Sequence, residues 1–424
     1  RLNKAKSTVR RGYTSVSNLY DFAELTGKYK KICDNTDGYF SGETTGYVFA
    51  DGIAVFPGFC DVHVHFREPG FSYKETIKTG SMAAAAGGYT SVCSMPNLNP
   101  VPDGLESLRV QTEIIERDSV IDVRPYGAIT KGEKGKILAD IDELAPYVCA
   151  FSDDGKGVQN EEILLSAMKK CAELGKIVAL HEEDESLLLG GVINDGERAK
   201  ELGIKGICSM SEYLPLQRDI FLAKEAKAKI HICHVSTKES VDIIRKAKLD
   251  GVDVTCETAP HYLILTDAEV KNEGRFKMNP PLRGEADRAA LIEGLLDGTI
   301  DMIATDHAPH GAKEKNGDLN SAPFGITGLE TAFALLYTFL VKGGVISLKK
   351  LLELICYNPR KRFGLQLRKD DFTVFDLNTE YAIDSQKFVS KGKSTPFDGR
   401  KVFGKCLATV YGGKTVWQES LIRN

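Results

Sequence analysis

The sequence lacks the features that mark several large classes of protein. Among its 424 residues, no uninterrupted apolar run approaches the roughly 18 residues that span a bilayer. Its basic beginning, residues 1–4, is not followed by an apolar segment, so we do not expect a secretory signal. The formal net charge is −4 without any basic block, which gives no support for nucleic-acid binding. We expect neither a membrane nor a nucleic acid as a partner.

Paired cysteines are also missing. The ten cysteines include no Cys-x-x-Cys pair, which argues against a zinc ribbon and against a disulfide framework. Several lie in apolar segments, namely Cys60, Cys93, Cys149, Cys233 and Cys256. We interpret them as small buried hydrophobic residues in a reducing compartment, and we therefore expect the protein in the cytoplasm.

From about residue 53, short apolar segments alternate with amphipathic ones. We expect strands at 53–65, 90–96, 121–129, 147–152, 176–181, 229–235, 252–257 and 300–305. The segments that are typical of helices include 73–86, 161–174, 217–228, 237–249 and 286–296. Eight strands alternating with helices predict an α/β protein with a parallel sheet, and eight is the number that closes a (β/α)8 TIM-like barrel. The alternative, a doubly wound open sheet, normally has a Gly-x-Gly-x-x-Gly turn after its first strand, and this chain has none.

The chain is long for one ordinary domain, but a barrel of about 250 residues with a smaller domain would account for its length. We expect the barrel at 53–365. It would include a polar loop at 312–325, followed by helices at 328–342 and 347–356.

The two ends of the chain have a different pattern. Residues 1–50 are polar and rich in turn-forming residues, and a short strand is expected at 46–50. Strands return at 373–377, 401–403 and 407–411, and Gly412 and Gly413 favour a hairpin turn after the last of these. We therefore expect residues 1–52 and 366–424 to form a small flanking β domain.

Polar residues gather at the ends of the expected strands. His63 and His65 are one residue apart, so in an extended strand both point to the same side. In a (β/α)8 barrel, functional residues lie at the carboxyl ends of the strands. Polar residues follow five further strands, in the segments 94–97, 152–155, 181–182, 234–236 and 305–310. Six of the eight histidines lie at or just beyond these ends, an arrangement that scattered core histidines would not show.

Histidines and carboxylates that meet at one barrel mouth predict a metal centre. Imidazole and carboxylate ligands without thiolate suit Zn²⁺, with Mn²⁺ or Co²⁺ as substitutes. Four histidines and two carboxylates exceed the needs of one tetrahedral zinc with an open position, so two metals bridged by a hydroxide are the natural count. Metal binding lowers the pKa of water to roughly 7, which makes a nucleophile at neutral pH. The alternative is a buried polar network in an inactive barrel.

These segments carry a family resemblance. The run DVHVHFREPG at 61–70 resembles the signature of cyclic amidohydrolases, and specifically of bacterial dihydroorotases of the long, class I type. Further segments resemble the same family: 94–97 (SMPN), 151–155 (FSDDG), 234–240 (HVSTKES), 277–283 (KMNPPLR), 304–310 (ATDHAPH) and 394–397 (STPF). The resemblance extends from about residue 52 to about residue 415, and it implies a metal-dependent barrel enzyme.

The resemblance also implies a set of metal ligands. It distributes five residues over two Zn²⁺ ions: His63, His65 and Asp306 on one, and His181 and His234 on the other. The class I family bridges the two metals with an aspartate after the fourth strand, which matches Asp154. Asp153 should face the other way if the strand is still extended there. Lys156 is the alternative bridge, because many relatives in the wider superfamily use a carboxylated lysine.

The implied substrate is dihydroorotate, made reversibly from N-carbamoyl-L-aspartate in pyrimidine biosynthesis. Its carboxylate needs a cation, and the planar guanidinium of Arg67 can bind carboxylates with two hydrogen bonds. The other implied substrate contacts are His65, Asn97, Asn279, His310 and the backbone at Phe324 and Gly325. Asp306 is implied as general base and then acid, which takes a proton from the hydroxide and passes it to the amide nitrogen.

Two other functions share parts of this pattern. An allantoinase or hydantoinase-type hydrolase would have similar metal histidines but a neutral cyclic substrate, which would leave Arg67 without a partner. A non-catalytic scaffold would be expected to lack metal ligands, whereas this chain has all of them. Class I dihydroorotases pair with aspartate transcarbamoylase in some lineages, and the sequence leaves that partner and a homodimer open.

Overall fold

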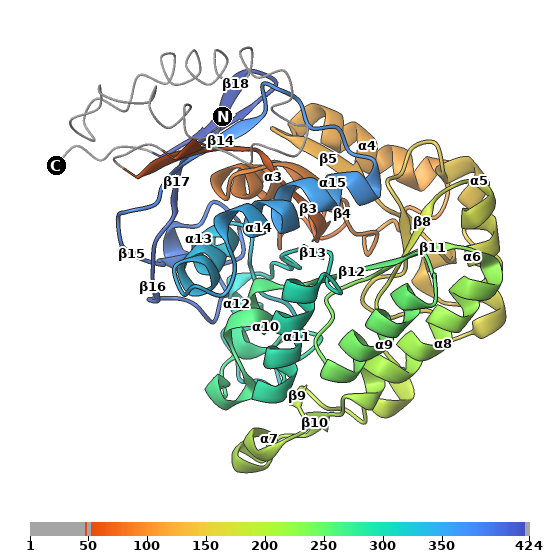
Figure 1. Ribbon diagram of the computed structural model, residues 1–424. Coiled ribbons are helices and arrows are strands. Elements are labelled where there is room, and N and C mark those ends of the chain that lie inside the picture. Colours follow the sequence, from red (N-terminus) through yellow and green to blue (C-terminus); the bar gives the residue numbers. More distant parts are fainter. Residues whose placement is uncertain (1–46, 49–51, 420–424) are drawn as a thin grey trace.

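The computed structural model of the protein describes residues 47–48 and 52–419 (Figure 1). Within these residues the chain is an α/β structure with parallel strands at its centre, as the alternating apolar segments predict. Most of residues 1–50, for which we expect a β element, lie outside the described residues. The described part contains β1 (Tyr47–Val48), which confirms a strand within 46–50.

Two parallel sheets form the centre of the molecule. One has three strands in the order β3-β4-β5, and the other has six in the order β6-β7-β8-β11-β12-β13. Their bounds are Phe59–Val64 (β3), Tyr89–Ser94 (β4), Asp122–Pro125 (β5), Gly127–Ala128 (β6), Phe151–Ser152 (β7), Ile177–Leu180 (β8), Lys229–Ile232 (β11), Val254–Thr258 (β12) and Met302–Ile303 (β13). Each of the eight expected strand segments overlaps at least one of these strands.

The two parallel sheets approach each other at both edges. Only Tyr126 separates β5 from β6, and its backbone N donates to the carbonyl oxygen of Ser94 at 2.9 Å. At the opposite edges, Val64 at the end of β3 forms an isolated parallel bridge with His307, which follows β13. The N of His65 donates to the carbonyl oxygen of His307 at 2.9 Å. The carboxyl ends of β3 and β13 therefore lie side by side.

Helices cover the parallel strands in chain order. In the series α3, α4, α5, α6, α8, α9 and α11, each helix packs against the next (Figure 1). Their bounds are Ile77–Ala86 (α3), Leu105–Asp118 (α4), Ile141–Leu144 (α5), Glu161–Glu173 (α6), Met210–Ala226 (α8), Lys238–Leu249 (α9) and Glu285–Asp297 (α11). The five expected helices are all present, but α8 begins well before residue 217 because it continues through Pro215, a residue that usually ends or kinks a helix.

Local sequence explains how these helices begin and which side they bury. The Oγ1 of Thr237 caps α9 by accepting a hydrogen bond from the N of Ser240 at 3.3 Å. Val241, Ile244 and Ala247 then recur every three residues and are buried against the strands. Among the described residues, no helix is both long enough and apolar enough to cross a membrane.

The remaining helices are short. They are α7 (Glu197–Leu202), α10 (Pro260–Ile264), α12 (Ala312–Lys315), α13 (Ala332–Leu336), α14 (Leu348–Leu352) and α15 (Asn358–Phe363). α13 continues as a π-helical turn at Tyr337–Val341, and α14 continues as another at Glu353–Tyr357. These segments confirm the helices expected at 328–342 and 347–356, and α12 lies in the expected polar loop.

A third sheet joins strands from both ends of the described chain. It is antiparallel, in the order β1-β2-β14-β17-β18. Besides β1, its strands are β2 (Ile53–Pro57), β14 (Phe372–Asp376), β17 (Lys405–Tyr411) and β18 (Lys414–Gln418). Gly412 and Gly413 form the expected turn, with φ of 56° and 73°. Two short pairs lie elsewhere: β9 (Ile193–Asn194) with β10 (Gly206–Ile207), and β15 (Tyr381–Ala382) with β16 (Lys401–Val402).

The single strand expected at 53–65 is wrong, because this segment forms two strands in two different sheets. The chain passes from β2 to β3 at Gly58, where a Cβ atom would lie 2.2 Å from Thr90 Oγ1, so no side chain fits. Phe56 of β2 and Phe59 of β3 both pack against Phe333, with ring centroids 5.6 and 5.3 Å apart. This aromatic cluster fixes the third sheet against β3, the strand that leads to the two histidines.

Candidate metal centre

The six residues predicted as metal ligands lie at the ends of the central strands. His63 is in β3 and His65 follows it, and the other four follow β7, β8, β11 and β13: Asp154, His181, His234 and Asp306. All six are buried, none more than 6% exposed. Because parallel strands run in one direction, their carboxyl ends meet on the same side, and residues far apart in the sequence come together there.

Asp154 lies at the centre of this group. Its carboxylate oxygens are within reach of all four histidines: 3.4 Å from His63 Nε2, 3.4 Å from His65 Nε2, 3.5 Å from His181 Nδ1 and 3.6 Å from His234 Nε2. Asp306 lies on one side of the group, with Oδ1 3.1 Å from His65 Nε2. Asp154 thus belongs to two triplets of donors, one with His63 and His65 and one with His181 and His234.

The donor atoms of both triplets fit metal ions. Within each triplet they lie within 4.8 Å of one another. His63 Nε2 and Asp154 Oδ1 are buried and have no hydrogen-bond partner among the described residues. Buried polar atoms normally have partners, and a metal ion between these two would supply one. The arrangement could hold two ions that share Asp154.

Both carboxylates of the group favour the ionised form that metal binding requires. Burial raises the pKa of Asp154, but His63, His181 and His234 outweigh it and hold that pKa well below its usual value. For Asp306, burial again raises the pKa, and the hydrogen bond from His65 together with the nearby imidazoles lowers it further than burial raises it. Asp306 is therefore ionised at neutral pH.

Asp153 and Lys156 do not point into this group. Asp153 Oδ1 accepts hydrogen bonds from the backbone N of Ile129 at 2.7 Å and of Thr130 at 3.0 Å. Lys156 is exposed to solvent, and its backbone N bonds to the carbonyl oxygen of Asp153 at 3.4 Å. Of the three candidates for a bridging residue, only Asp154 faces the four histidines.

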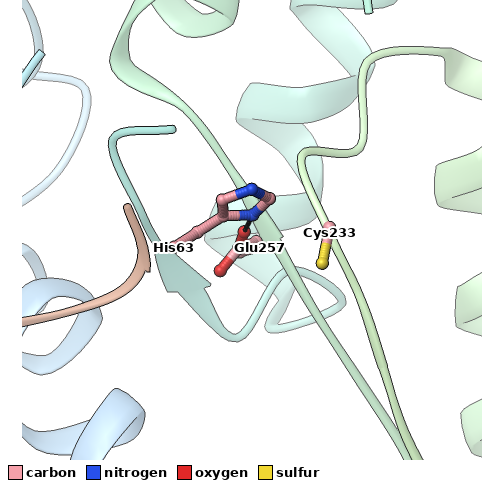
Figure 2. A group of neighbouring side chains, drawn as sticks. All are labelled: His63, Cys233 and Glu257. Carbon is pink, nitrogen blue, oxygen red and sulfur yellow. Dashed lines mark hydrogen bonds and ion pairs between the residues drawn. The ribbon is translucent and has the colours of Figure 1, made fainter. Parts of the chain in front are cut away.

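A buried carboxylate, that of Glu257, is hydrogen-bonded to His63 and holds its ring in place (Figure 2). Glu257, from β12, accepts a hydrogen bond from His63 Nδ1 at 2.7 Å through Oε1. Its Oε2 lies 3.1 Å from His231 Nε2, and His231 Nδ1 lies 2.9 Å from Thr255 Oγ1. With Nδ1 protonated and bonded to Glu257, His63 directs the lone pair of Nε2 toward Asp154. Sequence reasoning missed Glu257, although an acidic residue inside the apolar segment 252–257 was a signal for it.

Cys233 lies beside the same pair, and His63, Cys233 and Glu257 together resemble a third group of metal donors (Figure 2). Burial raises the pKa of the Cys233 thiol to about 12, although His63 opposes this shift. The His63 nitrogen on this side, Nδ1, is already bonded to Glu257. We interpret this group as support for His63 and not as a separate metal site.

The residues predicted to contact substrate surround the candidate metal centre. His65 Nδ1 lies 2.9 Å from Asn97 Oδ1, and Arg67 Nε donates to the carbonyl oxygen of Pro309 at 3.3 Å. Asn279 Nδ2 donates to Glu183 Oε2 at 2.5 Å, and Glu183 Oε1 lies 3.8 Å from His181 Nε2. Sequence reasoning also missed Glu183, which lies in a polar segment where a charged residue is not a signal.

The predicted contacts at His310, Phe324 and Gly325 are joined to one another. His310 Nε2 donates to the carbonyl oxygen of Phe324 at 2.7 Å, and the N of Gly325 donates to the carbonyl oxygen of Lys277 at 3.0 Å. Gly325 has a φ of +122°, and a Cβ atom there would lie 2.7 Å from the carbonyl oxygen of Ala308. Only glycine allows the loop to pass this close to the segment that follows β13.

Comparisons with known proteins agree with this geometry. The profile of a family described as "Dihydro-orotase-like" matches residues 52–240. The dihydroorotase of Ligilactobacillus salivarius (strain UCC118) is 49% identical over 401 residues, covering 92% of this chain and 93% of the relative. That of Enterococcus faecalis (strain ATCC 700802 / V583) is 50% identical over 378 residues, covering 87% and 88%. Among solved structures, the L-hydantoinase (dihydropyrimidinase) from Arthrobacter aurescens has a TM-score of 0.76 at 27% identity, covering 87% of this chain and 86% of that one.

Proposed function

Because the chain belongs to the dihydroorotase family, we propose that it catalyses the reversible cyclisation of N-carbamoyl-L-aspartate to L-dihydroorotate, a step of de novo pyrimidine biosynthesis. The observation that carries this proposal is the buried carboxylate of Asp154 within 3.6 Å of four histidines, with Arg67 bonded to Pro309, three residues after Asp306. Asp154 and the four histidines provide a site for hydrolytic metal chemistry, and Arg67 provides a cation for the carboxylate of the substrate.

The cofactor that this donor set would take is Zn²⁺, two ions per chain. His63, His65 and Asp306 would hold one ion, His181 and His234 the other, and Asp154 would be shared. Bound zinc supplies two things to such a reaction, a hydroxide nucleophile at neutral pH and polarisation of the amide carbonyl. Asp154 is the better bridge than a carboxylated Lys156, because the side chain of Lys156 is exposed to solvent.

Asp306 would move the proton. In the hydrolytic direction its carboxylate accepts the proton of the nucleophile, and it then donates that proton to the amide nitrogen that leaves. The ionised state of Asp306 suits the first step, and its burial keeps bulk water from competing for the proton. In the biosynthetic direction the same carboxylate takes the proton from the amide nitrogen and returns it to the departing hydroxide.

Arg67 would bind the substrate carboxylate. Among the described residues only its Nε has a hydrogen-bond partner, the carbonyl oxygen of Pro309. Both terminal nitrogens of the guanidinium therefore remain for a planar, two-bond contact with a carboxylate. The remaining substrate contacts in this proposal are His65, Asn97, Asn279, His310 and the backbone at Phe324 and Gly325.

We also propose that the two parallel sheets form one (β/α)8 barrel. The hydrogen bonds at both pairs of edges and the series of helices in chain order support this architecture. The barrel would comprise residues 53–365, and residues 1–52 with 366–424 would form the flanking β domain. The third sheet supports this division, although β2, which begins at residue 53, pairs with β14 and so belongs with the flanking strands.

The cellular setting and the assembly are proposals of the same kind. The nine cysteines among the described residues are all unpaired, which supports a reducing compartment such as the cytoplasm. A homodimer and a complex with aspartate transcarbamoylase are the assemblies that we propose to test, by measuring the mass of the purified protein in solution alone and with that enzyme.

An assay of dihydroorotate hydrolysis before chelation, after chelation and after zinc is restored tests the proposal most directly. We expect activity to disappear with the metal and to return with zinc, and metal analysis should approach two zinc ions per chain. A hydantoinase-type enzyme would instead turn over allantoin or dihydrouracil but not dihydroorotate. A non-catalytic scaffold would hold less than one zinc per chain in carefully prepared protein.

A further inference from the structure

We propose that Lys315 is a positioning residue that holds together the two backbone segments expected to contact the substrate, 277–279 and 323–325. This inference rests on the proposed function for the identity of the substrate. Lys315 is neither an expected metal ligand nor part of the proposed proton transfer.

Lys315 lies at the end of α12 and turns inward. The residue is only 6% exposed, whereas Lys313 on the same short helix is exposed. Its Nζ donates to the carbonyl oxygen of Lys277 at 3.0 Å and to that of Pro323 at 2.8 Å. Pro323 directly precedes Phe324, and Lys277 lies two residues before Asn279. One side chain therefore joins the two segments, beside the direct hydrogen bond from the N of Gly325 to the carbonyl oxygen of Lys277 at 3.0 Å.

The contacts of Lys315 distinguish it from an ordinary buried ion pair. Among the described residues no carboxylate forms a salt bridge with its Nζ, and both of its hydrogen-bond acceptors are backbone carbonyls. Burial, reinforced by the charge of Lys277, lowers the pKa of Lys315 to about 7. A neutral amine still has two N–H groups, so the ammonium and the amine can both make the two bonds. Burying this group without an acidic partner is unfavourable unless its hydrogen bonds to the protein compensate for the lost hydration.

The other polar contacts of α12 come from Glu314, whose Oε1 lies 3.4 Å from Lys74 Nζ and 3.4 Å from the hydroxyl oxygen of Tyr73, and neither of these residues belongs to the two segments. A cavity of about 670 Å³ lies along it and is lined by Ala312, Lys315 and Asn316, and by Ser394 and Thr395 from the C-terminal segment. Among the described residues, the bond from Lys315 Nζ to the carbonyl oxygen of Lys277 is the hydrogen bond that joins α12 to the segment at 277–279. Further along the loop, Leu319 is fully buried in the apolar core, so the two bonds of Lys315 add specific polar contacts to that anchor.

The position of this loop directly determines where the expected substrate contacts lie. The carbonyl oxygen of Phe324 accepts the hydrogen bond from His310 Nε2 at 2.7 Å. The ammonium of Lys277 lies 4.6 Å from the centroid of the Phe324 ring, a cation–π contact across the same two segments. If Lys315 released the carbonyl oxygen of Pro323, the next residue and its bond to His310 would shift as well. Lys315 thus acts on the substrate through His310 and the backbone, not by touching it.

Lys315→Met tests this role, because methionine keeps the length and the apolar contacts but donates no hydrogen bond. We expect the KM for dihydroorotate to rise about tenfold, as for the loss of a buried hydrogen bond, with kcat changed less than about twofold and zinc content unchanged. The amide of Gly325 should exchange its hydrogen about tenfold faster in this variant. Lys315→Arg, which retains N–H donors, should recover part of the KM, and the matched control Lys313→Met should leave KM and exchange unchanged.

Hydrogen exchange keeps the proposal separate from the identity of the reaction. If the wild-type protein failed to turn over dihydroorotate but Lys315→Met still accelerated exchange at Gly325, the proposed function would be wrong and the role of Lys315 in the loop would stand. Unchanged exchange and unchanged KM in Lys315→Met would overturn the inference. Loss of zinc together with kcat would also overturn it, since Lys315 would then support the metal centre. Thermal unfolding shows that each variant is folded, and Lys315→Gln replaces the methionine variant if that one is not.

Discussion

Replacing Glu257 by glutamine tests how His63 is held in the candidate metal centre. Glutamine is nearly the same size, so the change removes the negative charge but fills the same space. The carboxylate lies 2.7 Å from His63 Nδ1, and both residues are at most 1% exposed. A hydrogen bond to a charged group typically contributes about 1.5–3 kcal/mol, and loss of the outer partner of a ligating histidine typically weakens metal binding roughly 10–100-fold. The two ranges agree, because each tenfold change in affinity is about 1.4 kcal/mol.

We therefore expect Glu257→Gln to bind zinc roughly 10–100-fold more weakly than the wild type, measured by competition with a chromophoric chelator at neutral pH. Activity should fall when zinc is limiting and recover when it is in excess. Glu173→Gln is a matched control, because that carboxylate is 70% exposed at the end of α6. If the variant is folded, as judged by circular dichroism, and holds zinc as tightly as the wild type, then Glu257 does not position His63 and the reasoning is refuted.

Four further predictions test other parts of the site and of the fold. Arg67→Ala should raise the KM for dihydroorotate about a hundredfold, since it removes two charge-assisted hydrogen bonds, while metal analysis shows the zinc content retained. Asp306→Asn should lower kcat by a factor of roughly 10²–10⁴, as expected for loss of a general base, and a similar kcat in steady-state assays would exclude that role. Asp154→Asn should lose zinc by metal analysis, whereas Lys156→Met should retain it; the reverse result would make Lys156 the bridge. Burial raises the pKa of Glu330 to about 7, so the folded protein binds a proton there that the unfolded chain has lost above its ordinary value of 4.5. The contribution of Glu330 to the free energy of unfolding is fully present below about pH 4.5 and is lost as the pH rises through about 7. In denaturant unfolding, the free energy of unfolding of Glu330→Gln should therefore decline less steeply over that pH window than that of the wild type.

The alternation of strands and helices could be predicted from the sequence because each central strand is a short apolar segment between amphipathic ones. The division at Gly58 could not. The residues of β2 and of β3 are all buried, and apolar residues lie on both sides of the glycine. Which sheet each strand joins depends on pairing with β14, more than 300 residues away in the chain. A pattern read over ten residues holds no information about that partner.

The positions of the metal-ligand candidates could be predicted because strand direction places them. A histidine or an aspartate at the carboxyl end of an apolar segment lies on the same side as the others whatever the rest of the chain does, provided that the strands are parallel. The supporting residues depend instead on contacts between distant segments. His63 and Glu257 are 194 residues apart, Asn279 and Glu183 are 96 apart, and Lys315 and Lys277 are 38 apart. The spacing of residues along the chain does not show these contacts.

Some supporting residues can nevertheless be recognised in the sequence. Asp61 is an acid inside the apolar segment that leads to His63, and it is fully buried. Its Oδ1 accepts a hydrogen bond from the N of His63 at 3.0 Å, and its Oδ2 accepts one from the N of Thr305 at 3.0 Å, so it joins β3 to the segment before Asp306. Glu257 has the same signature on β12. A charge is costly inside an apolar strand unless it is bonded there, so an acid in a strand that leads to a metal centre indicates a supporting contact. Lys315 lies in a polar loop where charged residues are common, and for that reason only the folded structure distinguishes it from Lys313.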